Sequence, residues 1–233
     1  MADQLPVLEM AARFKAIPSA TIYDTLDSMG LPNQCLSLQI RPLRPDMRIA
    51  GPALTVRGGR EPRNHHDEPD MMLPKFHDRG MYKAVYPGCV LVINSEAEQQ
   101  CGHFGEMTSY ALRQRGASGI VIDGGIRDGR HLLQIPGWSV FVRYLSPIES
   151  AHRFSANDFQ IPIALTGTLT SQVRIDPGDW IVGDETGILS VPKGVAYEVL
   201  LKSEEIEERE QKSREEMAAG IPAEEVFARY HRT

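Results

Sequence analysis

The chain has 233 residues, with 25 Lys and Arg against 31 Asp and Glu and a formal net charge of −6. This length supports one sizeable hydrophobic core, and 42% hydrophobic with 24% charged residues excludes a wholly disordered chain. The mild acidity argues against a nucleic-acid platform, which normally carries a basic stripe, so we expect no nucleic-acid partner. The basic residues divide unevenly into 19 Arg and 6 Lys.

The cysteines and the first residues predict a soluble, cytoplasmic protein. Cys35, Cys89 and Cys101 are odd in number and widely spaced, which argues against a disulfide scaffold or a zinc ribbon. The sequence begins Met-Ala-Asp-Gln, without the basic and apolar regions of a signal peptide. Apolar runs such as 89–93 have the length of a strand and are too short to span a membrane.

The N-terminal segment predicts two short helices. Apolar residues recur at helical spacing within 7–14, and the run stops before Pro18. Ser19 offers an N-cap for a second helix, which Gly30 closes. Short strands are expected within 36–56.

Residues 58–80 are expected to form a polar loop that is exposed or folded over a site. The loop contains side chains of metal-ligand type: His65, His66, Asp67, Asp70 and His77. Their spacing matches no defined metal motif, so a mobile polar loop is the favoured interpretation. The alternative is a substrate-selecting lid that adds a histidine to the site.

The centre of the chain predicts a parallel crossover. A buried strand at 89–93 is followed by a helix over 106–115, which ends at Gly116, and by a strand at 119–122. Strand, helix and strand within some thirty residues form a βαβ unit, which is expected to be right-handed.

Beyond residue 138 the pattern changes to short strands, and a long charged helix follows. The strands are expected at 140–142, 161–165, 173–175, 180–182 and 188–191. Tight-turn sequences separate the later strands, which favours an antiparallel sheet or a small barrel. Helices follow over 193–219 and after Pro222, with an acidic face over 203–217 that is either solvated or packed on a subunit. We therefore predict a single α/β domain over 1–192 and a helical extension over 193–233.

The strongest sign of a site follows the central strand directly. The segment 123–129 reads Asp-Gly-Gly-Ile-Arg-Asp-Gly, so that Arg127 and Asp128 stand side by side at the carboxyl end of a parallel strand. Ligands bind at such strand ends in open α/β sheets. The alternative is a polar turn whose two charged side chains form surface ion pairs.

A second feature of this sheet edge lies at the start of the preceding helix. Gly105, Glu106 and Met107 occupy that helix end, whose backbone amides lack intrahelical partners and suit a carboxylate or phosphate. The alternative is that Glu106 merely complements the helix dipole. Because the crossover brings both loops to one edge, Arg127 could neutralise an anion there and Asp128 could hold a hard divalent cation.

These residues resemble the signature of a known family. Glu106, twenty further residues and Arg127-Asp128 match the acidic-X20-Arg-Asp motif of class II pyruvate aldolases acting on 4-hydroxy-4-methyl-2-oxoglutarate or 4-carboxy-4-hydroxy-2-oxoadipate. Close relatives of these aldolases include the RraA-like regulators of ribonuclease activity. The likeness extends to further stretches in the expected order, at 21–26, 49–56, 87–92 and 183–192.

The resemblance implies a swivelling β/β/α-type fold, assembled as a homotrimer or homohexamer with active sites near subunit interfaces. It implies that Asp128 anchors Mg²⁺ or Mn²⁺, largely through waters, and that Arg127 binds substrate oxygens. It also implies that the amides of Gly105, Glu106 and Met107 hold the pyruvyl carboxylate. This chain departs from the family at Glu106, where the aldolases carry Asp, which leaves the role of that side chain open.

The implied reaction is retro-aldol cleavage of a 4-hydroxy-2-oxo diacid, which leaves a pyruvate enolate. A Schiff-base lysine could stabilise the enolate, but none of the six lysines lies within an apolar strand. A divalent metal beside an arginine is the other solution, and the sequence favours it. The same chemistry would decarboxylate oxaloacetate. The base for the 4-hydroxyl is not identified.

Two other functions stay open. One is a non-catalytic RraA-like regulator that binds a ribonuclease or another protein, and the other is a lyase or hydratase acting on a different small oxyacid. Two further polar residues have alternative interpretations. His103 either reaches the ligand or is a satisfied structural histidine, and Asp184 either faces the site or a neighbouring subunit or is a simple turn residue.

Overall fold

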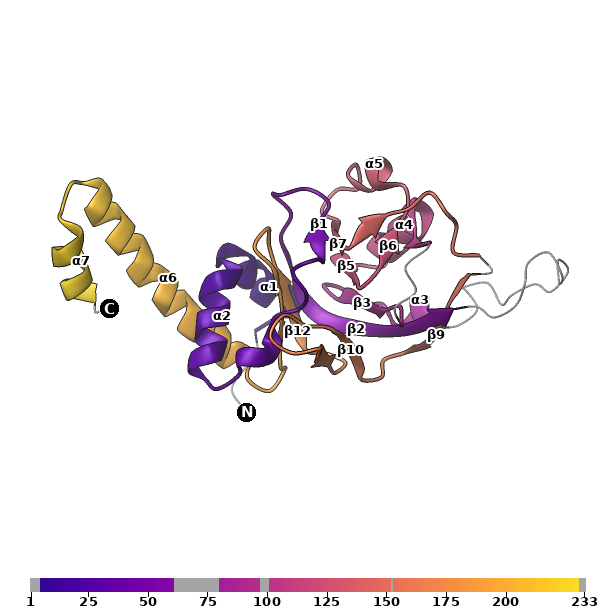
Figure 1. Cartoon of the computed structure of the whole chain (residues 1–233), viewed down its shortest axis with the longest axis horizontal. Helices are drawn as coiled ribbons and strands as arrows, with labels where there is room; N and C mark the ends of the chain where they lie inside the picture. The colour runs from indigo at the N-terminus through magenta and orange to yellow at the C-terminus, as the bar shows by residue number, and fades with distance from the viewer. Residues whose placement is uncertain (1–4, 61–79, 97–100, 152, 231–233) are drawn as a thin grey trace, which may run out of the picture.

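The computed structural model describes residues 5–60, 80–96, 101–151 and 153–230. Within them a main sheet has the strand order β1-β7-β5-β3-β2-β12-β13, with β9 also paired to β2 (Figure 1). The strands of this sheet are β1 (Arg41–Pro42), β2 (Ile49–Arg60), β3 (Val90–Asn94), β5 (Gly119–Ile122), β7 (Ser139–Val142), β9 (Phe154–Phe159), β12 (Trp180–Gly183) and β13 (Ile188–Val191). Strands β2, β3, β5 and β7 run parallel, and their remaining neighbours pair antiparallel.

The parallel strands form the centre of the core because both of their faces are covered. Strands β5 and β7 are buried along their whole length, as expected for continuous apolar runs in a parallel sheet. Helices α3 (Met81–Ala84), α4 (Glu106–Gln114) and α5 (Gly129–Leu132) lie on one face, where Leu91, Leu112 and Ile120 pack together. The hairpin of β10 (Ile163–Thr166) and β11 (Gln172–Ile175) covers the other face.

The predicted α/β class and the central crossover are confirmed. Strand β3, helix α4 and strand β5 follow in sequence, and β3 pairs with β5 in parallel. The expectation of antiparallel structure after residue 138 is wrong for the strand predicted at 140–142, because β7 continues the parallel sheet beside β5. A four-residue apolar run carries no directional information, so its sequence could not show this. The antiparallel part begins with β9, which was not predicted.

A second, small parallel sheet prolongs the first. Strands β4 (Gly102–Phe104), β6 (Gly125–Ile126) and β8 (Tyr144–Leu145) pair in the order β4-β6-β8. Strand β6 follows β5 after two residues and β8 follows β7 after one, so the chain bends from one sheet into the next. The bend is tight: a Cβ on Gly125 would stand 2.2 Å from the Tyr144 ring. This small sheet carries the candidate site.

The two N-terminal helices are confirmed, but the cap of the second is not Ser19. Helix α1 spans Val7–Ala16 and α2 spans Ser19–Ser28, followed by the 3-10 turn η1 (Pro32–Gln34). Gly30, at φ 78°, terminates α2 as expected. Ser19 is the first helical residue, and the carboxylate of Asp184 accepts hydrogen bonds from its amide (2.8 Å) and its hydroxyl (2.6 Å).

Asp184 is therefore a buried structural residue. The amide of Thr186 also donates to its Oδ1 atom, at 2.8 Å, and the residue is 3% exposed. The carboxylate joins the turn between β12 and β13 to the start of α2, across 165 positions of sequence. Of the interpretations offered for Asp184, the structure supports a residue of the turn, with the added function of capping a distant helix.

The C-terminal helices are α6 (Ala196–Ala218) and α7 (Ala223–Tyr230), close to the predicted bounds. Figure 1 shows α6 leaving the body of the molecule beside α2, with α7 folded back along its far end. The first turns of α6 bury Val199 and Leu200 against the N-terminal helices, whereas its outer part is joined to α7 by ion pairs such as Arg229–Glu216, at 2.7 Å. The division into a domain and an extension at 192/193 stays a prediction.

The predicted polar loop starts later than expected. Gly58, Gly59 and Arg60 belong to β2 and pair with β9, because a register shift lets the polar strand continue past Arg57. His65, His66, Asp67, Asp70 and His77 lie outside the described residues. No helix in the described part of the chain is long and apolar enough to cross a bilayer.

Candidate active site

The structure brings the two predicted loops to one edge of the small sheet. Arg127 and Asp128 follow β6 directly, and the N-terminus of α4 lies beside them. The amide of Arg127 donates to the carbonyl of Phe104 at 2.8 Å, and the amide of Glu106 donates to Asp128 Oδ2 at 3.2 Å. The juxtaposition inferred from the crossover is therefore present in the fold.

Asp128 occupies an unusual backbone conformation at this junction. Its φ of 59° and ψ of 32° lie in the left-handed region, which costs free energy for a residue with a Cβ. Its carbonyl accepts hydrogen bonds from the amides of His131 and Leu132, at 2.8 and 3.0 Å, which start α5. The residue is exposed, so its side chain is accessible to a ligand. Such strain, held by surrounding contacts, is common at functional sites.

Gly105 permits the close approach of this carboxylate. A Cβ at Gly105 would stand 2.6 Å from Asp128 Oδ2, so the carboxylate would have to shift to admit a side chain there. The φ of Gly105, −144°, is open to all residues, so the preference for glycine is steric and local. The glycine lets the start of α4 and the Asp128 carboxylate share one small space.

Arg127 keeps hydrogen-bond donors available at the site. Its Nη1 lies 3.8 Å from Glu149 Oε1, a loose ion pair with a carboxylate that is 66% exposed. Its Nε is buried, and no described residue accepts a hydrogen bond from it, so any contact with a ligand would come from the two Nη atoms. A planar guanidinium whose Nη atoms are held by only one loose ion pair is suited to binding carboxylate or oxo oxygens of a small anion.

The backbone amides at the start of α4, predicted to bind an anion, are only partly available in this arrangement. The Glu106 amide already donates to Asp128, so a ligand carboxylate would have to share or displace that contact. Met107 directs an exposed side chain outward, with 78% of its surface accessible. The binding of a pyruvyl carboxylate by the amides of Gly105, Glu106 and Met107 stays a prediction.

The side chain of Glu106 has a partner that the sequence reasoning missed. Its Oε2 lies 3.3 Å from Nδ1 of His131, which stands on α5, three residues after Asp128. In the sequence, the one sign of this contact is that His131 lies three residues after Asp128. That spacing points to Glu106 only once α5 is known to lie beside α4.

His103 is structural in this fold. It is 4% exposed on β4, and its Nδ1 lies 3.0 Å from the carbonyl of Gly125 and 3.1 Å from its amide. The ring also packs edge-on against Phe154, with centroids 4.4 Å apart. These contacts, made through Nδ1 and the ring, favour the structural interpretation of His103 over contact with a ligand.

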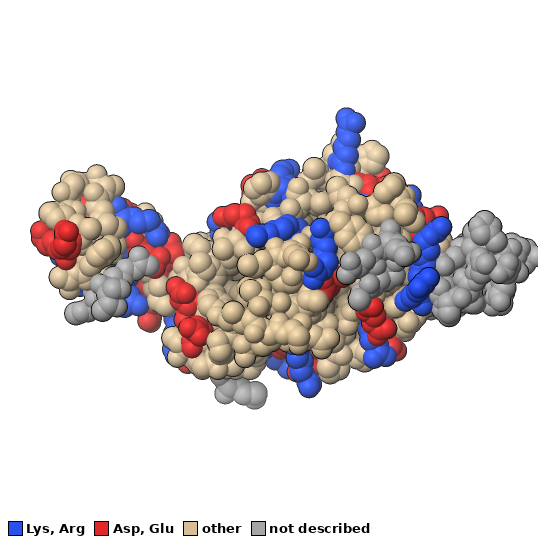
Figure 2. All heavy atoms as spheres, in the orientation of Figure 1, with Lys and Arg blue, Asp and Glu red and all other residues tan. Residues whose placement is uncertain are grey.

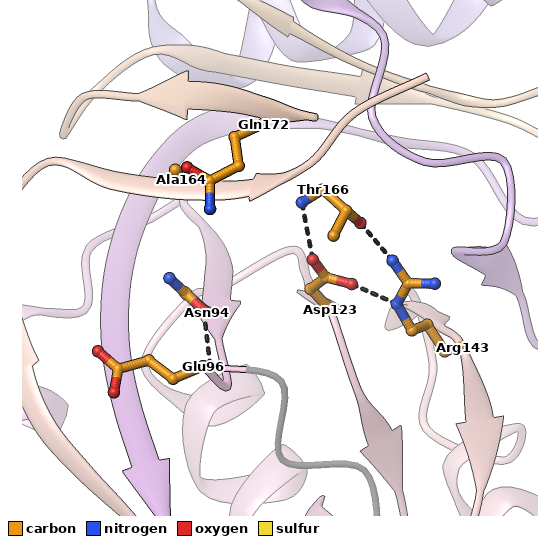
Figure 3. Close-up of a pocket in the computed structure, with 7 residues that line it drawn as sticks. All are labelled: Asn94, Glu96, Asp123, Arg143, Ala164, Thr166 and Gln172. Carbon is orange, nitrogen blue, oxygen red and sulfur yellow. Dashed lines mark hydrogen bonds and ion pairs between the residues drawn. The ribbon is translucent and has the colours of Figure 1, made fainter. Parts of the chain in front are cut away.

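A cavity of about 440 Å³ lies at the bend between the two sheets (Figure 3). Figure 3 shows Asp123 and Arg143 pointing toward one another, with Thr166 of β10 beside both. Asp123 pairs with Arg143 and accepts the Thr166 amide at 2.8 Å, and Arg143 also bonds the Thr166 hydroxyl. The two charged side chains are 9% and 13% exposed, so this pair ties the ends of β5 and β7 to the hairpin.

The residues around Asp128 offer few ligands for a divalent metal. In the described part of the chain, no three His, Cys, Asp or Glu side chains gather closely enough to form a complete ligand set. Mg²⁺, however, keeps several waters and is commonly held by one or two carboxylates together with substrate oxygens. The exposed Asp128 carboxylate beside Arg127 fits that weaker mode of binding.

The charges on the visible surface are mixed. On the face shown in Figure 2, Lys and Arg side chains are dispersed among Asp and Glu side chains. The acidic residues of α6 lie largely in intrahelical or α7 ion pairs, such as Lys212–Glu208 at 2.6 Å.

Comparisons with known proteins agree with this fold. The family described as RraA-like, Aldolase/RraA, matches residues 19–190. A protein from Halalkalibacterium halodurans named "Putative 4-hydroxy-4-methyl-2-oxoglutarate aldolase" is 30% identical over 199 residues, which covers 84% of this chain and 82% of the relative.

Two solved structures share the fold. An uncharacterized protein from Pseudomonas syringae pv. tomato superposes with a TM-score of 0.76 at 24% identity, covering 96% of this chain and 99% of that one. Streptomyces coelicolor RraAS2, described as an unusual member of the RNase ES inhibitor RraA protein family, gives a TM-score of 0.72 at 24% identity, covering 91% and 98%. The chain belongs to the Aldolase/RraA family.

Proposed function

We propose that this protein is a divalent-metal-dependent lyase that cleaves a 4-hydroxy-2-oxo diacid to pyruvate and a second oxo acid. The observation that carries the proposal is the position of Arg127 and Asp128 beside the start of α4, where the Glu106 amide donates to Asp128 Oδ2 and the Arg127 guanidinium makes only a loose ion pair, 3.8 Å from Glu149. The aldolase name of the relative from H. halodurans supports the same reaction class. Decarboxylation of oxaloacetate is proposed as a side activity.

In this reaction Arg127 binds the oxygens on which negative charge develops. The 4-hydroxyl loses its proton to water, and its oxygen becomes the carbonyl oxygen of the second oxo acid as the C3–C4 bond breaks. The electron pair of that bond passes into a pyruvate enolate, which takes up a proton at C3 to give pyruvate. A guanidinium already aimed at the oxyanion stabilises this charge without reorganisation at the moment of reaction. The fixed positions of Arg127 and Asp128 at the end of β6 therefore orient the substrate before the bond breaks.

Asp128 is proposed as the protein ligand of Mg²⁺ or Mn²⁺. The metal would supply Lewis-acid polarisation of the 2-oxo group. The hydrogen bond from the Glu106 amide to Oδ2 fixes the carboxylate, which leaves Oδ1 directed away from that contact. A side chain at position 105 would displace Oδ2 from this contact.

We also propose a homo-oligomer, a trimer or hexamer, with the site near a subunit interface. Large apolar side chains around the site support this: Met107, Tyr110, Leu133, Leu145 and Ile148 are all exposed in the single chain. Burial of such a patch against another copy would remove it from water. Light scattering coupled to size exclusion tests the assembly. A cytoplasmic location is proposed from the free cysteines alone.

The second candidate is a non-catalytic regulator that binds a ribonuclease or another protein. It is favoured by the fold shared with Streptomyces coelicolor RraAS2, a member of an RNase inhibitor family. A pure binding protein needs neither an arginine with unused donors nor a strained aspartate at a helix start, so the lyase is preferred. A lyase or hydratase acting on another oxyacid would use the same residues.

The experiment is a pyruvate-coupled assay with Mg²⁺, with Mn²⁺ and with chelator. It is run on oxaloacetate and on several 4-hydroxy-2-oxo acids. Metal-dependent release of pyruvate supports the lyase, whereas no activity on any substrate favours the regulator.

A further inference from the structure

Glu106 and His131 form a side-chain pair next to Asp128. Glu106 Oε2 and His131 Nδ1 are 3.3 Å apart, and the two side chains are 31% and 56% exposed. The pair joins the first residue of α4 to α5, so it spans the two elements that flank Asp128. An isolated exposed ion pair adds little to stability, so the stability of the fold does not depend on this contact.

The contact orients the imidazole. A carboxylate accepts a hydrogen bond from Nδ1–H, which leaves the Nε2 lone pair of the neutral ring as an acceptor. Within the described ranges, no residue hydrogen-bonds His131 Nε2. The ring is thus held through Nδ1, and Nε2 is left to accept a hydrogen bond from a ligand.

Glu106 connects the imidazole ring to the Asp128 carboxylate. Glu106 bonds Asp128 through its amide, at 3.2 Å, and bonds His131 through its side chain. The carboxylate and the imidazole therefore flank the same residue at the helix start. A ligand that contacts Arg127 and Asp128 and extends across the first turn of α4 would meet the imidazole.

We propose that His131, held by Glu106, accepts a hydrogen bond from the 4-hydroxyl of the substrate. This inference rests on the proposed lyase function and assigns to His131 the preference for 4-hydroxy-2-oxo acids over oxo acids that lack the hydroxyl. A site built to hydrogen-bond a hydroxyl discriminates against analogues without it, because the protein group is then left unpaired. His131 is a specificity-determining residue, and Glu106 is its positioning residue.

The test compares two substrates in each variant. Oxaloacetate has no 4-hydroxyl, so its decarboxylation reports on Arg127 and Asp128 alone, whereas cleavage of a 4-hydroxy-2-oxo diacid reports on the hydroxyl contact as well. We measure kcat/KM for both substrates in the wild type, His131→Ala, Glu106→Ala and Glu106→Gln. Arg130→Ala is the matched control, an exposed neighbour on the same short helix.

The expected result is a change of substrate preference. His131→Ala should lower kcat/KM for the hydroxy acid roughly tenfold, the worth of one hydrogen bond, with oxaloacetate turnover little changed. Glu106→Ala should shift the preference in the same direction, and Glu106→Gln, which keeps an acceptor for Nδ1–H, should restore part of it. Arg130→Ala should keep the wild-type ratio.

The outcomes separate this inference from the function on which it rests. An unchanged ratio in His131→Ala, or an equal loss on both substrates, overturns the role of His131 while the lyase stands. A wild-type protein that turns over neither substrate overturns the lyase, and the inference with it. Thermal unfolding of each variant excludes loss of fold as the cause of a changed ratio.

Discussion

The backbone amide of Glu106 donates a hydrogen bond to Oδ2 of Asp128 across 3.2 Å, although the two residues are 22 positions apart. The contact fastens the start of α4 to the residue that follows β6 and Arg127. The two parts of the sequence motif, the acidic residue and the Arg-Asp pair, therefore lie in direct contact. A change that displaces the Asp128 carboxylate should therefore disturb the whole site.

Gly105→Ala should displace the Asp128 carboxylate directly. The added Cβ would stand 2.6 Å from Asp128 Oδ2, so the carboxylate or the helix start must move. Misplacement of a catalytic group by about 1 Å can cost on the order of a hundredfold in rate, so we expect a loss of that order in kcat/KM. Gly194→Ala is the control, since nothing lies within 4 Å of its Cβ position. Wild-type kcat/KM in Gly105→Ala would show that the position of Asp128 does not matter.

Asp184→Ala should destabilise the protein without touching the site. It leaves the amides of Ser19 and Thr186 and the hydroxyl of Ser19 without their buried acceptor. Loss of hydrogen bonds to a buried charged group costs about 3 kcal/mol, measured as the free energy of unfolding in urea. Asp24→Ala, an exposed change on the same helix α2, should cost far less. Equal effects of the two substitutions would contradict the capping role.

The same carboxylate predicts part of the acid sensitivity. Burial alone would raise the pKa of Asp184, but hydrogen bonds from Ser19 and from the amides of Thr186 and Gly187 outweigh it, and the pKa lies below its usual value. The stabilisation is therefore complete above the unfolded-state pKa of about 3.9 and is lost as pH falls through the lower, folded-state pKa. The stability difference between the wild type and Asp184→Asn should shrink over that acidic range. A difference that is constant from pH 6 to pH 2 would refute this assignment.

Arg143→Ala should lower the stability of the fold because it leaves the buried Asp123 carboxylate without its ion-pair partner. Asp123 would keep the Thr166 amide but lose its ion-pair partner, in surroundings where the two side chains are 9% and 13% exposed. Removing one member of a buried pair costs about 3–5 kcal/mol, again measured by denaturant unfolding. The exposed pair Arg174–Asp176 provides the comparison, and Arg174→Ala should change stability little. If Arg143→Ala lowered the free energy of unfolding as little as Arg174→Ala does, the Asp123–Arg143 pair would not be structural.

The sequence predicted those parts of the fold that short-range pattern determines. The strand at 89–93, the helix ended by Gly116 and the strand at 119–122 are each defined by a local apolar run and its turn, and together they form the crossover. Strands β4, β6 and β8 are too short for any periodicity, so the small sheet that carries Arg127 could not be seen. The direction of β7 is likewise a tertiary property.

The candidate site was predictable to the extent that it follows the crossover. Arg127, Asp128 and the start of α4 meet because both loops leave the same edge of the sheet. The other contacts join distant positions through side chains: Asp184 caps Ser19, Arg143 pairs with Asp123, and His131 contacts Glu106. No local pattern records such pairings, which depend on how whole elements pack.

Arg127 and Asp128 are the residues proposed to carry the metal-dependent lyase reaction, and single substitutions test this role most directly. The measurement is the kcat/KM for pyruvate release from a 4-hydroxy-2-oxo diacid with Mg²⁺ or Mn²⁺, in the wild type, Arg127→Ala and Asp128→Ala, with and without chelator. We predict chelator-sensitive release by the wild type and a loss of about 10²–10³-fold in Arg127→Ala, the usual cost of removing an oxyanion-stabilising donor. Asp128→Ala should respond little to added metal. Metal-dependent pyruvate release that survives both substitutions would contradict the account.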